Sequence, residues 1–277
     1  MPNPVDLDFR SDVPVFDANV ALGRRHDRRV PAETPGDLLA EMDRFGIDRA
    51  LVYCQHAVTF DAVEGNRMLL EMIAGHRERL VPQFVFNPAY DDLPAFVKST
   101  EDAGVRSVRM APTQHKYPLR SWVAGDFIAW AAGLERPREL PQQPTPIWIS
   151  AFDVDPSQLA DMLETVPALT VVLCEPHYTH IPWIIPLLRS RSNLRVEISR
   201  AVIGDAIPRL IEAAGHSRVL HGSWWPEGSL AAQLYALHRC GLDQEQLMAI
   251  CARNLDHLLG APSPGGRGQG ARPSGEG

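Results

Sequence analysis

Four polar side chains lie within or directly after short apolar runs of this sequence. They are Asp17, Asn19, Arg109 and Glu175. A carboxyl such as Glu175 acts as a general acid or base where apolar walls raise its pKa. A guanidinium such as Arg109 binds a ligand carboxylate through two parallel N–H bonds, or it pairs with Asp17 or Glu175 inside the protein. These residue types indicate proton transfer and the binding of a small acidic molecule.

Four further candidates occupy similar places. Ser150 ends the apolar run 146–150, and Trp224 lies in a Gly-Ser-Trp-Trp-Pro segment. His115 and His177 lie in segments that follow two other apolar runs. Binding residues concentrate in loops that a rigid scaffold positions. We therefore expect Ser150, His115 and His177 to contact a ligand, and Trp224 either to stack on it or to fill the space.

Short apolar or β-branched runs alternate with helical patterns along most of the chain. The eight runs lie near 13–19, 49–54, 80–86, 106–111, 146–150, 169–174, 194–199 and 218–222. Strands that alternate with helices pair in parallel through crossover connections. Eight such units in about 250 residues predict an α/β fold of the (β/α)₈ TIM-barrel type, with the candidate residues at its C-terminal mouth.

The ends of the helices have recognisable signals. Thr34 is a predicted N-cap, followed by proline, and Gly46 ends the same helix. Asp155 opens another helix in the same way, and a helix over 93–103 ends before a glycine. The stretch from Asp243 to Leu259 is predicted to be helical and to close the floor of the barrel or flank it.

Two segments resemble strand signatures of the amidohydrolase-related metal-dependent hydrolases, a family that includes decarboxylases and lactonases. Residues 15–23 read Val-Phe-Asp-Ala-Asn-Val-Ala-Leu-Gly, and residues 219–226 read Val-Leu-His-Gly-Ser-Trp-Trp-Pro. They resemble the family's first and eighth strands. Weaker matches between them and in the last helix follow in the expected order, so the resemblance covers residues 13–260. It implies a barrel with its site at the C-terminal strand ends.

The resemblance also implies a catalytic metal, held from the first, fifth and sixth strands and assisted by an aspartate on the eighth. In this sequence the corresponding residues are Asn19, Ala21, Ser150, Glu175 and Trp224. Only the carboxylate of Glu175 is an ordinary zinc ligand. We therefore expect no metal and no other cofactor.

Two hypotheses follow for a barrel without the family's metal. In the first, the protein is a metal-independent hydrolase or decarboxylase-type lyase for a small aromatic or carboxylated molecule, with Glu175 as acid or base. In the second, it is a non-catalytic scaffold whose mouth is packed shut by Trp224 and Trp225. A pocket larger than about 300 Å³ beneath Trp224 favours ligand binding. Trp148 and Trp183 are also predicted to wall this mouth.

A third hypothesis keeps a metal-dependent hydrolase with relocated ligands. It requires Glu175 and two of Asp17, His177 and His180 within about 4 Å of one point. Other histidines read as ordinary helix or loop residues, and His221 is predicted to face the surrounding helices because its strand parity is opposite to that of Trp224.

The net charge and composition of the chain limit the classes of partner that we expect it to bind. The formal net charge of −7 gives no electrostatic reason to expect nucleic acid or a membrane surface as partner. No apolar run is long enough for a spanning helix and no secretory signal is visible, so we expect a cytoplasmic protein with reduced cysteines. The sequence is compatible with a homo-oligomer. We expect an extension over 1–12, one barrel domain over 13–260 with a loop over 136–145, and a disordered tail over 261–277.

Overall fold

A computed structural model describes residues 9–25, 29–30, 33–134, 144–202 and 204–260. The predicted tail over 261–277, most of the extension over 1–12 and most of the loop over 136–145 lie outside the described residues, as does His26.

Among the described residues, nine short strands build the centre of the fold. They are β1 (Phe16–Leu22), β2 (Arg49–Cys54), β3 (Leu80–Pro82), β4 (Phe84–Val85), β5 (Val108–Met110), β6 (Ile147–Ser150), β7 (Val171–Cys174), β8 (Leu194–Glu197) and β9 (Val219–Leu220). All ladders between them are parallel, in the orders β1-β2-β3 and β4 to β9. Sequential parallel pairing is typical of a (β/α)₈ barrel.

Hydrogen bonds join the two sheets into one closed barrel. The predicted run 80–86 divides into β3 and β4 at Gln83, whose N–H donates to the carbonyl of Val52 at 2.8 Å. At the other junction, the N–H of Ala18 donates to the carbonyl of His221 at 3.0 Å. The eight predicted strands are thus confirmed, with the third interrupted by one residue.

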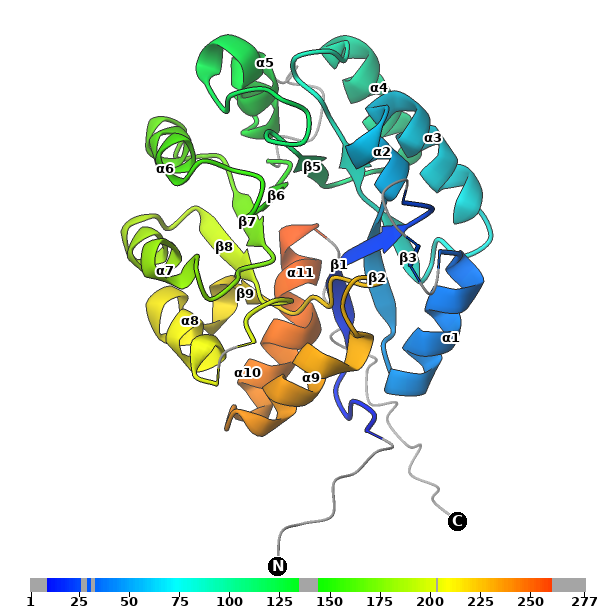
Figure 1. Cartoon of the computed structure of the whole chain (residues 1–277), viewed down its shortest axis with the longest axis vertical. Helices are drawn as coiled ribbons and strands as arrows, with labels where there is room; N and C mark the ends of the chain where they lie inside the picture. The colour runs from blue at the N-terminus through cyan, green and yellow to red at the C-terminus, as the bar shows by residue number, and fades with distance from the viewer. Residues whose placement is uncertain (1–8, 26–28, 31–32, 135–143, 203, 261–277) are drawn as a thin grey trace, which may run out of the picture.

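Helices surround this ring of strands (Figure 1). They are α1 (Pro35–Phe45), α2 (Gln55–Thr59), α3 (Ala62–Met72), α4 (Leu93–Ala103), α5 (Ser121–Ala131), α6 (Pro156–Thr165), α7 (Ile181–Ser190), α8 (Ala206–Ala214), η1 (His216–Arg218), α9 (Leu230–Arg239), α10 (Gln244–Met248), η2 (Ala249–Arg253) and α11 (Asn254–Leu258). The predicted stretch from Asp243 to Leu259 is helical, but its middle turn η2 is a π-helix.

The predicted caps are present in the structure. Thr34 and Asp37 form a reciprocal capping box at the start of α1, and Gly46 ends that helix with a φ of 72°. The side chain of Asp155 accepts two backbone N–H bonds at the start of α6. These local signals fix where each helix begins and ends, and therefore how the strands between them are placed.

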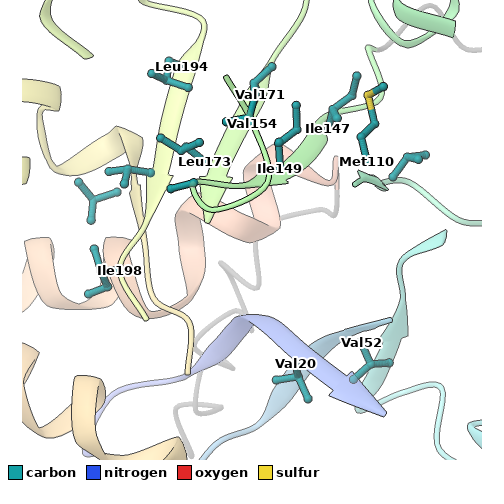
Figure 2. Close-up of a cluster of buried hydrophobic side chains, with 14 of the residues drawn as sticks. Val20, Val52, Met110, Ile147, Ile149, Val154, Val171, Leu173, Leu194 and Ile198 are labelled. Atoms are coloured by element: carbon teal, nitrogen blue, oxygen red, sulfur yellow. The ribbon is translucent and has the colours of Figure 1, made fainter. Parts of the chain in front are cut away.

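Apolar side chains fill both faces of the barrel wall. On the outer face, alternate strand residues such as Ile147, Ile149, Val171 and Leu173 pack toward the helices (Figure 2). On the inner face a second cluster comprises Phe16, Ala18, Leu51, Trp148, Val172, Cys174, Leu220, Ala252, Leu255 and Leu259. Its members from η2 and α11 close the floor of the barrel. The final helical stretch was predicted to close the floor or to flank the barrel, and the first of these positions is the one found.

The first strand begins later than predicted, at Phe16 instead of residue 13. Pro14 lacks the backbone N–H that a strand residue donates to its neighbour, which explains the delayed start. All four cysteines are free thiols. Among the described residues, no helix is both long enough and apolar enough to cross a membrane.

Candidate functional site

A pocket of about 510 Å³ opens at the C-terminal ends of the strands. Its lining includes Ala21, Arg109, Ser150, Glu175, Arg200 and Trp224. The mouth is therefore not packed shut, and its volume exceeds the lower limit of about 300 Å³ that is usual for ligand pockets.

Glu175 lies at the end of β7 with its carboxylate held on several sides. The Ser150 hydroxyl donates to Oε2 at 2.7 Å, and the Asn19 amide donates to Oε1 at 3.3 Å. The nearest nitrogen of Arg109 lies 3.6 Å from Oε1. The φ of Glu175 is 59°, a left-handed conformation that non-glycine residues rarely adopt. Such strain at a pocket is typical of a functional position.

Arg109 is the buried cation of this cluster. Its Nε donates to the Gln83 side chain at 3.1 Å, and its Nη2 donates to Oδ1 of Asn19 at 2.7 Å. Its guanidinium carbon lies 4.0 Å from the ring centroid of Tyr53. Of the two roles left open by the sequence, the structure contains the internal pairing, and the partner is Glu175. Arg109 nevertheless lines the pocket, so its charge reaches a bound molecule.

Glu197 is a member of the cluster that the sequence analysis missed. It is fully buried, and its Oε2 accepts bonds from Asn19 (3.0 Å), the backbone of Glu175 (3.2 Å) and the Ser199 hydroxyl (2.9 Å). Burial raises its pKa to about 8, and the charge of Glu175 adds to the shift. The sequence did contain a signal for Glu197, because Glu197 and Ser199 are polar residues two positions apart in the predicted strand 194–199.

Asp17 lies beside this cluster, where its carboxylate binds backbone N–H groups. Its Oδ1 accepts the N–H groups of Asn19 and Ser223, each at 3.0 Å. Burial raises its pKa to about 6. Asp17 does not line the pocket, and the register of β1 is irregular between Asp17 and Val20. The simple period of two that would place Asp17 and Asn19 on one face is interrupted there.

The two loop histidines predicted to contact a ligand do not line the pocket. The Nε2 of His115 lies 2.9 Å from the carbonyl of Val58. The Nδ1 of His177 lies 3.1 Å from the Thr179 hydroxyl, and the His177 N–H donates to the ring of His180. The ring of His115 thus contacts α2, and the ring of His177 contacts its own loop. His221 is fully buried, and its orientation toward the surrounding helices stays a prediction.

The rim of the pocket contains a stacked cation. The guanidinium carbon of Arg200 lies 4.3 Å from the ring centroid of Phe152 and 4.4 Å from that of Trp224. All three residues line the pocket. Trp224 thus faces the mouth as predicted, with a φ of 59°. Arg200 and Phe152 were missed because both follow strand ends on loops.

Trp148 and Trp183 were predicted to wall the mouth, but this prediction is wrong because neither lines the pocket. Trp148 precedes Ser150 by two residues, so it shares the inward face but lies about 6.6 Å deeper along the strand. There its indole N–H donates to the carbonyl of Ala18 at 3.1 Å. Trp183 lies on α7, with its ring centroid 5.9 Å from that of His180 and the two rings tilted by 53°.

Asp153 is a second carboxyl that lines the pocket and that the sequence analysis missed. Its Oδ1 accepts the backbone N–H of Gln114 at 2.8 Å. Burial raises its pKa to about 6, and the nearby charge of Glu175 contributes. An acid with that pKa exchanges protons readily near neutral pH.

Comparison with known proteins identifies the family. Residues 8–256 match the family model described as amidohydrolase. The chain belongs to the amidohydrolase family. No curated protein sequence matches it.

Solved structures of amidohydrolase-like barrels resemble this one in fold. The 5-carboxyvanillate decarboxylase of Sphingomonas paucimobilis has 14% identity and a TM-score of 0.68, over 90% of this chain and 100% of that one. The 2,6-dihydroxybenzoate decarboxylase of Rhizobium has 12% identity and a TM-score of 0.69, over 90% and 99%. The 5-carboxyvanillate decarboxylase of Novosphingobium aromaticivorans, complexed with manganese and a nitrobenzoic acid, has 11% identity and a TM-score of 0.70, over 91% and 98%.

The donor set of this amidohydrolase does not fit a divalent metal. In the part of the chain that the structure describes, no group of three or more His, Cys, Asp or Glu side chains could hold an ion. The relocated set of Glu175 with Asp17, His177 or His180 is therefore not assembled. Three residues at the family's ligand positions, Asn19, Ser150 and Glu175, instead form a hydrogen-bonded network next to the Arg109 guanidinium.

Proposed function

We propose that this amidohydrolase binds a small aromatic acid in its mouth pocket and decarboxylates it by proton transfer, with the Arg109 guanidinium as the fixed positive charge. The observation that carries the proposal is Glu175, whose backbone is left-handed and whose side chain lines a pocket of about 510 Å³ beside Arg109. The similarity in fold to decarboxylases of carboxylated aromatic acids supports the choice of substrate class. The open pocket favours this proposal over a non-catalytic scaffold.

The reaction needs one group that accepts a proton and one that donates it. Glu175 accepts the proton of a ring hydroxyl next to the carboxylate that will leave. Asp153 gives its proton to the ring carbon that bears this carboxylate. The bond between the two carbons then breaks, its electron pair returns to the ring, and CO₂ departs.

The charges that develop in this reaction explain the surroundings of Glu175. Negative charge collects on the ring oxygen once its proton has left, and Arg109 stabilises that charge at fixed geometry. The ring oxygen then takes its proton back from Glu175, and Asp153 regains a proton from solvent. No other reactant is consumed.

An assay with hydroxybenzoates tests the proposal. Purified protein is incubated with 2-hydroxybenzoate, 2,6-dihydroxybenzoate and 5-carboxyvanillate, and CO₂ release and loss of substrate absorbance are followed. Glu175→Gln keeps the size of the side chain but removes the base, so kcat should fall at least about 100-fold. Asp126→Asn, on the exposed surface of α5, is the matched control and should retain wild-type turnover. Full turnover by Glu175→Gln, or no turnover of any substrate by wild type, contradicts the proposal.

A further inference from the structure

The mouth pocket is lined by three arginines in different electrostatic situations. Arg25 pairs with Glu227 at 2.8 Å. Arg109 is buried and already engaged with Asn19, Gln83 and Glu175. Arg200 is partly exposed, and its side chain makes no hydrogen bond or ion pair with any described residue. Two of these cations, Arg25 and Arg109, therefore have carboxylate partners already, whereas the N–H groups of Arg200 remain available.

Two aromatic rings fix the position of the Arg200 guanidinium. Phe152 and Trp224 lie 4.3 Å and 4.4 Å from the guanidinium carbon of Arg200. Stacking between rings stabilises a guanidinium through its faces and does not use its N–H groups. A long side chain that is otherwise mobile is thus held ready, which lowers the entropy lost when a ligand binds.

We propose that Arg200, clamped between Phe152 and Trp224, binds a second acid group of the ligand that does not react. The preferred ligand is then an aromatic dicarboxylate, whose departing carboxylate lies near Glu175 while the other pairs with the N–H edge of Arg200. A planar guanidinium matches a carboxylate with two parallel hydrogen bonds. The inference rests on the proposed function, because it assumes that the pocket binds aromatic acids.

The role of Arg200 differs from that of the groups that move protons. A carboxylate held by two hydrogen bonds to a cation is stabilised as an anion, so it is not the one that leaves as CO₂. Arg200 is therefore a specificity-determining residue. It should affect affinity for ligands with two acid groups and leave ligands with one largely unchanged.

Calorimetric titration with two non-reacting probes tests the inference. Isophthalate has two carboxylates on one ring, and benzoate has one. Wild type should bind isophthalate at least about tenfold more tightly than benzoate, as expected for one charge-assisted contact. Arg200→Gln should abolish this preference, while its affinity for benzoate stays within about twofold of wild type. Arg200→Lys keeps the charge but loses the planar pair of N–H donors, so its preference for isophthalate over benzoate should be intermediate.

Arg209→Gln provides the matched control, because Arg209 is an exposed arginine on α8 that pairs with Asp205. It should keep the wild-type preference. An unchanged preference in Arg200→Gln overturns the inference, and so does an equal loss of both ligands, which would mean that Arg200 only supports the pocket wall. Failure of wild type to bind either probe overturns the proposed function as well. Thermal unfolding of each variant verifies that it is folded.

Discussion

The carboxyl of Asp153 connects the geometry of the pocket to a measurable pH dependence. Burial and the charge of Glu175 raise its pKa to about 6. A proton donor must be protonated to act, so turnover should be highest below that value. Above it the protonated fraction falls about tenfold for each pH unit.

The first prediction is therefore a descending limb in the pH profile of kcat with a midpoint near 6. Asp153→Asn should lower kcat at least about tenfold and remove this limb, because its amide has no proton to donate. The Asp126→Asn control should retain both the limb and the rate. A wild-type profile that is flat between pH 5 and pH 8 would show that Asp153 is not the donor.

Several residues of the site were accessible to sequence reasoning. Asn19 and Arg109 lie within strands, and Ser150 and Glu175 lie at or just after strand ends. The parallel order of the strands brings these positions to the same side of the barrel, so their proximity follows from the fold alone. Asp153 and Arg200 lie on loops, where no periodicity says which way a side chain points. Their places depend on tertiary contacts with Gln114, Phe152 and Trp224.

At the scale of elements, β8 and the end of β9 meet with almost no free space. A Cβ added to Gly222 would lie 2.4 Å from Oε1 of Glu197. That carboxyl links β8 to the ends of β1 and β7 through Asn19 and the backbone of Glu175. The buried Glu197 therefore requires a glycine at position 222. The sequence shows this requirement only once β8 and β9 are known to be neighbours.

Gly222→Ala should accordingly displace Glu197 and disturb the network at three strand ends. We expect the free energy of unfolding to fall by about 1–3 kcal/mol, the usual range for overpacking. Denaturation by urea measures this change. Gly75→Ala is the matched control, since nothing lies within 4 Å of its added Cβ, and it should change stability by less than about 0.5 kcal/mol. Equal effects of the two substitutions would contradict the tight contact described for Glu197.

At the scale of the whole molecule, the barrel and the candidate site depend on different residues. The inner and outer apolar clusters and the helix caps hold the fold, and none of them involves a metal ligand. The exchange of metal-binding side chains for Asn19, Ser150 and Trp224 therefore leaves the architecture intact. Sequence patterns predicted the barrel well for this reason, while the site required the contacts themselves.

Charge is also distributed unevenly over the whole molecule. The chain has a formal net charge of −7, yet Arg109 and Arg200 both line the mouth pocket. Together with Arg25 they balance the three carboxyls of the lining, Asp153, Glu175 and Glu227. The mouth is thus formally neutral in a negatively charged chain, and it repels an anionic ligand less than the chain as a whole does.

We propose that the fixed cation of this site is Arg109 and not a metal ion. Elemental mass spectrometry of tag-free protein, dialysed briefly without chelator, tests it most directly. We predict less than about a tenth of an equivalent of zinc, manganese, iron or nickel, because the donor set lacks the three ligands that hold such an ion. Close to one equivalent that survives dialysis would contradict the account.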